Sequence, residues 1–110
     1  MSLDIRFTSY EDVKCPHCGE IVSRKIADSV NSGGRDWYPI LEEIRYYVPN
    51  EPLTEENDWY GKDMVLTVEQ ADKVVWFLRK NTDLYNGNDV CMLIAAALYN
   101  HYTIVVNADW

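Results

Sequence analysis

Two cysteines near the start of the chain have the residue type and spacing that could do chemistry. Cys15 and Cys18 are separated by Pro16 and His17 and are followed directly by Gly19. Two thiolates at this spacing can bind one metal ion, and they can also exchange with a disulfide. The sequence therefore raises two kinds of chemistry at one turn, and each needs further residues from elsewhere in the chain.

The run from Cys15 to Gly19 resembles one knuckle of the zinc-ribbon and rubredoxin families. In those families the tight turn aims both sulfurs and several backbone N–H groups at one metal ion. The resemblance covers residues 13–22 and implies zinc bound by Cys15 and Cys18. Structural zinc is almost always four-coordinate, so two more ligands are needed. The chain has no second cysteine pair to supply them.

Cys91 and His101 are the obvious candidates for additional ligands. On one continuous helix they would lie about 15 Å apart along the axis and point in different directions. Cys91 stands in an apolar run, where a buried cysteine usually acts as a small hydrophobe, and His101 suits a helix end. Three alternatives stay open: a zinc shared by Cys15 and Cys18 of two chains, a site completed by one side chain such as Cys91 plus a carboxylate or water, and a degenerate knuckle without metal.

The same tetrapeptide is similar to the active-site motif of bacterial disulfide oxidoreductases of the thioredoxin fold. That resemblance implies Cys15 as the nucleophile, stabilised by a helix N-terminus and by His17, with Cys18 as the resolving thiol. It also implies a buried strand before the motif and a cis-proline opposite the thiols. Residues 10–14 are polar and acidic instead, and Pro49 is the nearest candidate for that proline. We therefore expect no enzyme and keep the oxidoreductase as an alternative.

Other catalytic and metal-binding motifs are missing from the sequence. It has no Gly-X-Ser-X-Gly elbow, no His-Glu-X-X-His and no phosphate-binding glycine loop. The chain holds only two histidines, which leaves few places for a general base. The carboxylates between residues 55 and 63 do not have the spacing of a calcium-binding EF-hand loop. We expect a solvated acidic loop there.

The charge balance indicates which partners the protein can meet. The formal net charge is −8, and all of the acidic excess lies after residue 35. Phosphate neutralisation needs clustered basic side chains, so we expect no direct nucleic-acid binding. An acidic surface can meet a basic protein partner, or it can imitate the phosphates of DNA and inhibit a DNA-binding enzyme. We expect a protein partner and keep the DNA mimic as an alternative.

The cysteine count and hydropathy predict the compartment. An odd number of cysteines, with two so close in sequence, does not suit a disulfide scaffold. The longest apolar run, residues 90–98, is about half the length that a membrane-crossing helix needs. The first residues lack a basic segment followed by an apolar one. We expect a cytoplasmic protein that does not bind a membrane.

Aromatic residues come in neighbouring pairs, and one pair differs from the others. We expect core positions for Trp37, Phe77 and one of Tyr46 or Tyr47, because aromatic side chains bury large areas. Trp59 and Tyr60 stand in the acidic segment between residues 49 and 62, which has no sustained helical or strand period. We therefore select Trp59 and Tyr60 as candidates for contact with a partner.

Strands and a joint are expected in the N-terminal third. Leu3, Ile5 and Phe7 alternate with polar residues, which predicts a half-buried strand. Residues 20–26 fit either a returning strand or a helix. Residues 31–34 have loop composition with two glycines, so we expect a joint there, between a hairpin unit at 1–34 and an acidic helical unit at 35–110.

The second unit carries helix signals. A helical period predicts a helix over residues 37–48 that Pro49 ends. Thr67 and Gln70 form a capping box for a second helix, and a third, beginning near residue 88, is apolar nearly all round and is expected at the centre of the fold. Residues 64–66 and 103–106 are expected to form short strands.

These elements predict a single α+β domain over residues 1–110. An N-terminal β-hairpin is built around the Cys-Pro-X-Cys-Gly knuckle, and about three helices with one or two short strands follow. The size, the acidity and the lone knuckle are similar to those of small uncharacterised prophage proteins. We expect a non-enzymatic binding or adaptor protein, with zinc and a homodimer as open alternatives.

Overall fold

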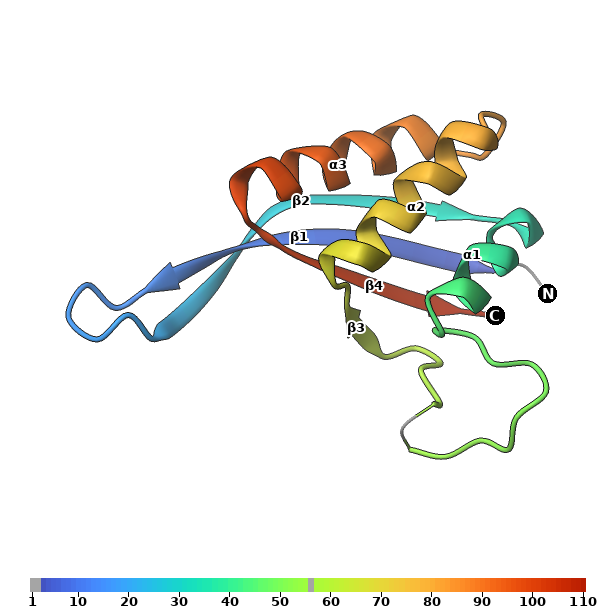
Figure 1. Ribbon diagram of the computed structural model, residues 1–110, viewed down its shortest axis with the longest axis horizontal. Coiled ribbons are helices and arrows are strands. Elements are labelled where there is room, and N and C mark those ends of the chain that lie inside the picture. The colour runs from blue at the N-terminus through green and yellow to red at the C-terminus, as the bar shows by residue number, and fades with distance from the viewer. Residues whose placement is uncertain (1–2, 56) are drawn as a thin grey trace.

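The computed structural model of this protein describes residues 3–55 and 57–110. These residues form a four-stranded antiparallel sheet with helices packed against it (Figure 1). The order of the strands across the sheet is β2-β1-β4-β3. The strands are β1 Asp4–Lys14, β2 Ile21–Gly33, β3 Asp63–Val65 and β4 Thr103–Asp109. Together with the helices, this sheet confirms the α+β class. The hairpin and the later segments share one sheet, because β1 pairs with both β2 and β4.

Three α-helices of the described residues lie over one face of the sheet (Figure 1). They are α1 Tyr38–Glu43, preceded by a single 3₁₀ turn over Arg35–Trp37, α2 Val68–Lys80 and α3 Gly87–Asn100. No helix in residues 3–55 and 57–110 is both long and apolar enough to cross a membrane.

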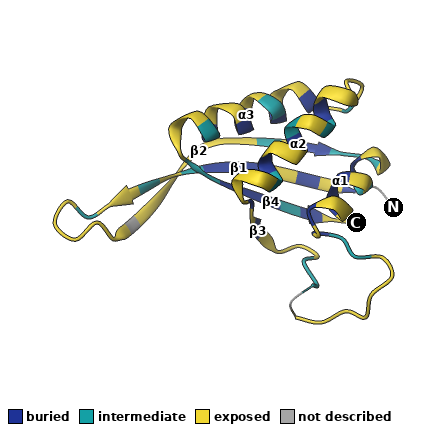
Figure 2. Cartoon of the chain, viewed as in Figure 1, coloured by how far each residue is buried: buried dark blue, intermediate teal, exposed yellow. Residues whose placement is uncertain are grey.

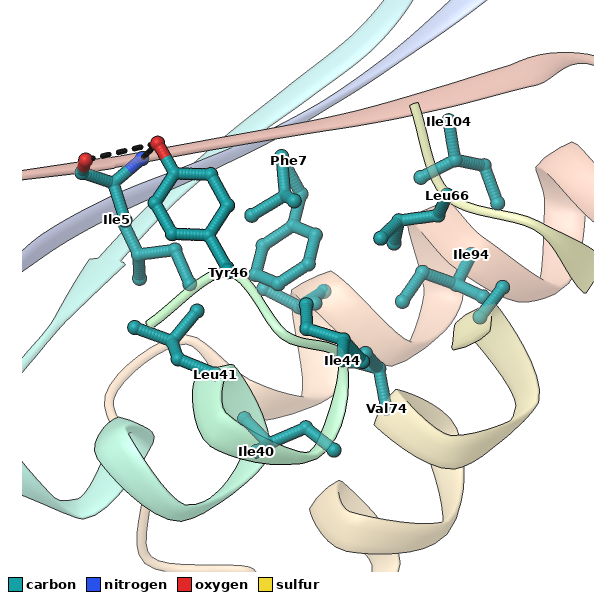
Figure 3. Close-up of a cluster of buried hydrophobic side chains, with 14 of the residues drawn as sticks. Ile5, Phe7, Ile40, Leu41, Ile44, Tyr46, Leu66, Val74, Ile94 and Ile104 are labelled. Atoms are coloured by element: carbon teal, nitrogen blue, oxygen red, sulfur yellow. Dashed lines mark hydrogen bonds between the residues drawn. The ribbon is translucent and has the colours of Figure 1, made fainter. Parts of the chain in front are cut away.

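The core lies between the sheet and the helices (Figure 3). The alternation in β1 places Ile5 and Phe7 on the helix side, where they are almost fully buried, while Arg6 between them is exposed. Trp37 and Tyr46 are also fully buried, and Phe77 packs at the edge of the core, as expected for these aromatic residues. Figure 3 shows how the sheet and all three helices contribute; the labelled side chains include Ile40, Leu41, Ile44, Leu66, Val74, Ile94 and Ile104.

The capping box predicted for the second helix is confirmed at the start of α2. The backbone N–H of Gln70 donates to Thr67 Oγ1 at 3.1 Å, and the backbone N–H of Thr67 donates to Gln70 Oε1 at 2.9 Å. Ala71, Val74 and Leu78 form the buried stripe that follows. The two strands expected after residue 63 are also present, with β3 beginning at Asp63 and β4 extending to Asp109.

The prediction of a loop at residues 31–34 is wrong, because β2 continues to Gly33. Tertiary hydrogen bonds hold these polar residues in the strand: buried Ser32 donates to the carbonyl of Tyr85 and accepts from Trp37 Nε1 at 2.9 Å. Gly33 suits close strand pairing, since a Cβ there would lie 2.5 Å from the carbonyl oxygen of Leu3. Of the ambiguous residues 20–26, all but Glu20 belong to the same strand.

The end predicted for the helix over residues 37–48 is wrong, because α1 ends at Glu43. Arg45 adopts a left-handed conformation with φ 62°. The N–H of Arg45 then bonds the carbonyl of Glu42 at 3.1 Å, and the N–H of Tyr46 bonds that of Leu41 at 2.8 Å, which is a Schellman end. The reversal turns Tyr46 into the core, a position that the helical period does not predict.

The central position expected for the third helix is also wrong. The inner face of α3 is buried through Val90, Leu93 and Ile94. The outer face is open to solvent, with Met92 70% and Tyr99 86% exposed, and Figure 2 shows the exposed stretches along this helix. Ala95 and Ala96 are exposed as well, because α3 lies on the sheet as an outside layer.

β1 and β2 extend well beyond the end of the pairing between β1 and β4. β4 pairs with β1 only from Asp4 to Tyr10, and the β1–β2 register shifts between Ser9 and Tyr10, so a bulge lies where the sheet narrows. Residues 11–26, here called the hairpin arm, project from the body as a two-stranded ribbon (Figures 1 and 2). The molecule is therefore elongated, with extents of 47 × 33 × 22 Å.

Candidate functional site

The hairpin arm presents the cysteine turn at its far end, and an ionic contact holds the arm at its base. Asp12 and Arg24 face each other across the two strands, with Arg24 Nε 3.1 Å from Asp12 Oδ1. Thr103, at the start of β4, donates its hydroxyl to the other carboxylate oxygen of Asp12 at 3.0 Å. Asp12 therefore connects both strands of the arm to the beginning of β4.

Backbone hydrogen bonds close the turn at the tip. The N–H of Cys15 donates to the carbonyl of Glu20 at 2.7 Å, and the N–H of Gly19 donates to the carbonyl of Cys15 at 2.9 Å. Gly19 has φ 75°, a left-handed conformation that other residues rarely adopt. The glycine that the sequence places after the second cysteine is therefore required by the bend.

The two thiols at the tip are close to each other and accessible. Cys15 is partly buried and Cys18 is exposed, and both are free. The pKa of the Cys15 thiol lies below its ordinary value. The largest cause is a hydrogen bond from the backbone N–H of His17, and hydrogen bonds with the backbone N–H and the side chain of Cys18 contribute less. Backbone donors around a cysteine sulfur stabilise the thiolate, which is the form that binds metals.

The structure does not bring Cys91 or His101 to this turn. Cys91 lies on α3 and packs against the core, and His101 is an exposed residue that ends the same helix. Within residues 3–55 and 57–110, no group of three or more histidine, cysteine or acidic side chains gathers where a metal could be held. One chain therefore offers the knuckle two sulfurs from its described residues.

The arrangement that the oxidoreductase resemblance implies differs from the one observed. Cys15 follows β1 and precedes a turn into β2, so it does not stand at the N-terminus of a helix. The described residues contain no cis peptide bond, and Pro49 lies in the loop after α1. The lowered pKa of Cys15 therefore arises from the turn itself.

The aromatic pair singled out in the acidic segment lies on the main body, in a cluster around Trp110. Trp59 is partly buried, with its ring centroid 6.4 Å from that of Tyr46. Tyr60 is 50% exposed and meets Trp110 edge-on, at 4.9 Å between centroids. No local pattern identifies Trp110, because this residue reaches the cluster through the pairing of β4.

The carboxylates of the acidic segment are not gathered into a calcium site in the part of the chain that the structure describes. Asp58 Oδ1 accepts a hydrogen bond from the N–H of Tyr60 at 3.4 Å, and Asp63 accepts one from Asn107 Nδ2 at 2.8 Å. Glu56 lies outside the described residues. These side chains order the loop and the edge of the sheet.

Comparison of the chain with protein-family models, with curated proteins and with solved structures found no match. The function must therefore be inferred from the geometry of the two surfaces described above.

Proposed function

We propose that this protein is a non-enzymatic binding module in which two copies assemble by sharing one zinc ion at the tips of their hairpin arms. The observation that supports it is the position of Cys15 and Cys18: two thiols on a projecting turn, with no third ligand nearby among the described residues. The proposal takes the first of the three alternatives that the sequence left open.

Coordination chemistry requires the second copy. Zinc in a structural site takes four ligands in a tetrahedron, and thiolates are among those it prefers. A twofold axis through the metal would bring Cys15 and Cys18 of each chain together and complete four sulfurs. The backbone N–H groups around Cys15 would offset part of the negative charge of a tetrathiolate centre.

The surface of the arm is consistent with a covered state. Val13, Ile21 and Ile26 are 42%, 49% and 61% exposed on a ribbon of only two strands. An isolated two-stranded hairpin is marginally stable in water, and exposed apolar side chains beside unpaired strand edges favour association. Two arms that meet at a shared zinc could cover these side chains against each other.

The test is the zinc content together with the native mass of the reduced protein. We expect one zinc per two chains and a dimer that dissociates when a chelator removes the metal. The double variant Cys15→Ser, Cys18→Ser should be a folded monomer without zinc. Cys91→Ser is the matched control and should keep both the zinc and the dimer, because Cys91 packs on the body.

Two results would contradict the proposal. One zinc per chain in a monomer would mean that each knuckle completes its own site. A dimer that persists in the double serine variant would mean that the arms or bodies associate without metal.

A further inference from the structure

A second surface, independent of the cysteine turn, lies on the body between the loop after α1 and the end of β4. It is a cavity of about 450 Å³. We call it the aromatic pocket and define it by the residues that the inference uses: Tyr47, Trp59, Tyr60, Trp110, Glu51 and Asp58. These residues come from three separate parts of the chain.

The rings of the aromatic pocket stand nearly perpendicular to one another. Tyr60 and Tyr47 meet Trp110 at 87° and 83°, with centroids 4.9 and 5.2 Å apart. Rings at right angles form adjoining walls, so a ligand in the cavity that they border can contact more than one ring. Such a box of aromatic faces is the arrangement by which proteins recognise cationic groups.

The charge around the pocket has the matching sign. Glu51 and Asp58 line it, and no lysine or arginine is among the described residues that do. Glu51 is paired with exposed Arg45 at 3.1 Å, and Asp58 accepts a backbone hydrogen bond, so neither carboxylate is buried without a partner. Asp63 and Asp109 add to the negative potential: after burial, they are the charges that raise the pKa of the neighbouring Tyr46.

Another exposed tryptophan of the body shows the contrast. Trp76 on α2 already has a cation on its ring, since Lys80 Nζ lies 3.9 Å from the ring centroid. The groove beside Trp76 also contains Lys73, which pairs with Glu43 at 3.2 Å. The chain therefore places a cation of its own on the Trp76 ring, whereas at the aromatic pocket Arg45 pairs with Glu51 and none of the described lysines or arginines lies over a ring.

We propose that the aromatic pocket binds the lysine or arginine side chain of a basic protein segment. The cation would enter the cavity and rest against the rings of Trp110, Tyr60 and Tyr47, with the carboxylates of Glu51 and Asp58 at the rim. Attraction to the ring faces would hold the charge, and the carboxylates would favour a cation over a neutral group. The net charge of −8 favours approach of such a segment from solution.

The probe for this proposal is N-acetyl-arginine amide, compared with N-acetyl-citrulline amide, which has nearly the same shape and no charge. Both are titrated into the protein while the indole N–H signals of its tryptophans are followed by NMR. We expect saturable shifts at Trp110 and Trp59, with the arginine compound binding about fivefold or more tightly than the citrulline compound. Trp76 should shift little, because Lys80 occupies its ring face.

Variants of Tyr60 test whether the arginine compound binds in the aromatic pocket or elsewhere on the surface. Tyr60→Leu should weaken binding of the arginine compound about two- to fivefold, and Tyr60→Phe, which keeps the ring, should not. Tyr85→Leu is the matched control, because Tyr85 is 71% exposed in the turn before α3 and does not line the pocket. Far-UV circular dichroism checks that each variant is folded.

Several results would overturn the proposal, and none depends on zinc. They are equal affinity for the arginine and citrulline compounds, shifts at Trp76 as large as those at Trp110, and no saturable binding of either compound. Loss of the dimer in the serine variant should leave these titrations unchanged.

Discussion

Tyr46 is the residue on which the arrangement of the body depends most visibly. Its ring is fully buried in the core (Figure 3). Its hydroxyl lies 2.7 Å from the carbonyl of Lys62 and 3.0 Å from that of Ala108. The same oxygen accepts from the N–H of Ala108 at 2.8 Å. One side chain therefore joins the segment after α1 to β4 and to the loop that leads into β3.

Removal of this hydroxyl should destabilise the fold. Tyr46→Phe keeps the ring and leaves the N–H of Ala108 without its partner, so we expect a loss of about 1–3 kcal/mol in the free energy of unfolding. Denaturant titration measures it. Tyr85→Phe, at an exposed tyrosine, should change stability by less than about 0.5 kcal/mol. An equal effect of the two substitutions would contradict the role given to Tyr46.

The same residue should make stability fall at alkaline pH. Burial, and then the nearby Asp63 and Asp109, raise the pKa of Tyr46 above its ordinary value of 10.0. The folded state therefore holds this proton more tightly than the unfolded state. Its contribution is fully present below pH 10.0 and is lost as the pH rises through the folded pKa. Unfolding titrations across this range should show the gap between wild type and Tyr46→Phe narrowing; a constant gap would contradict it.

Two helices end at residues that pay a conformational cost. Arg45 after α1 and His101 after α3 have φ of 62° and 58°, and neither is a glycine. In α3, the N–H of Tyr102 bonds the carbonyl of Ala97 at 2.8 Å and the N–H of His101 bonds that of Leu98 at 3.4 Å. These bonds hold His101 in a left-handed conformation that its side chain disfavours.

Replacement of His101 tests whether this residue ends a helix or binds metal. His101→Gly should raise the free energy of unfolding by up to about 1 kcal/mol, because glycine adopts this conformation without strain. His101→Ala, which keeps the Cβ, should give no comparable gain. Zinc content should be the same in all three proteins. A fall in zinc in both variants would make His101 a ligand and would contradict the shared site.

An element could be predicted from the sequence when the interactions that form it lie within one short segment of the chain. The alternation in β1 and the capping box of α2 are local patterns, and both were predicted. The strand at residues 31–33 depends on the tertiary bonds of Ser32 with Trp37 and Tyr85, which no local pattern contains. The early end of α1 turns Tyr46 toward Ala108, a partner that is also distant in the sequence. Local preference was overridden where distant groups satisfied the backbone or a side chain.

The sites divide in the same way. The turn that holds Cys15 and Cys18 could be predicted, because its geometry is encoded in adjacent residues. Trp59 and Tyr60 could be selected because their segment has no helical or strand period that would assign them to the core. Trp110 and Glu51 could not be found, since only the fold brings them beside the aromatic pair.

At the scale of the whole molecule, the two proposed surfaces lie at opposite ends of the sheet. Asp109, next to Trp110, pairs with Asp4 at the start of β1, whereas Thr103 pairs with Tyr10 where the arm begins. A dimer joined at the arm tips would therefore leave both aromatic pockets free. Such a dimer could hold two basic segments at once, which makes the two sites a bivalent binding device.

Bivalency predicts slower release from a surface that carries many basic segments. On a dense layer of arginine-containing peptide, the wild-type dimer should dissociate on the order of tenfold or more slowly than the double variant Cys15→Ser, Cys18→Ser. Surface plasmon resonance measures this difference, and a sparse layer, on which only one pocket can be engaged, is the control. Equal dissociation on the dense layer would mean that the two pockets of a dimer do not act together.

The most direct test of the shared zinc site is X-ray absorption spectroscopy at the zinc edge of the Cys91→Ser protein. This variant retains only Cys15 and Cys18 in each chain. We predict four sulfur neighbours at about 2.3 Å, which a single chain cannot provide. Two sulfurs with two nitrogen or oxygen neighbours would contradict the account, because each knuckle would then hold its own ion.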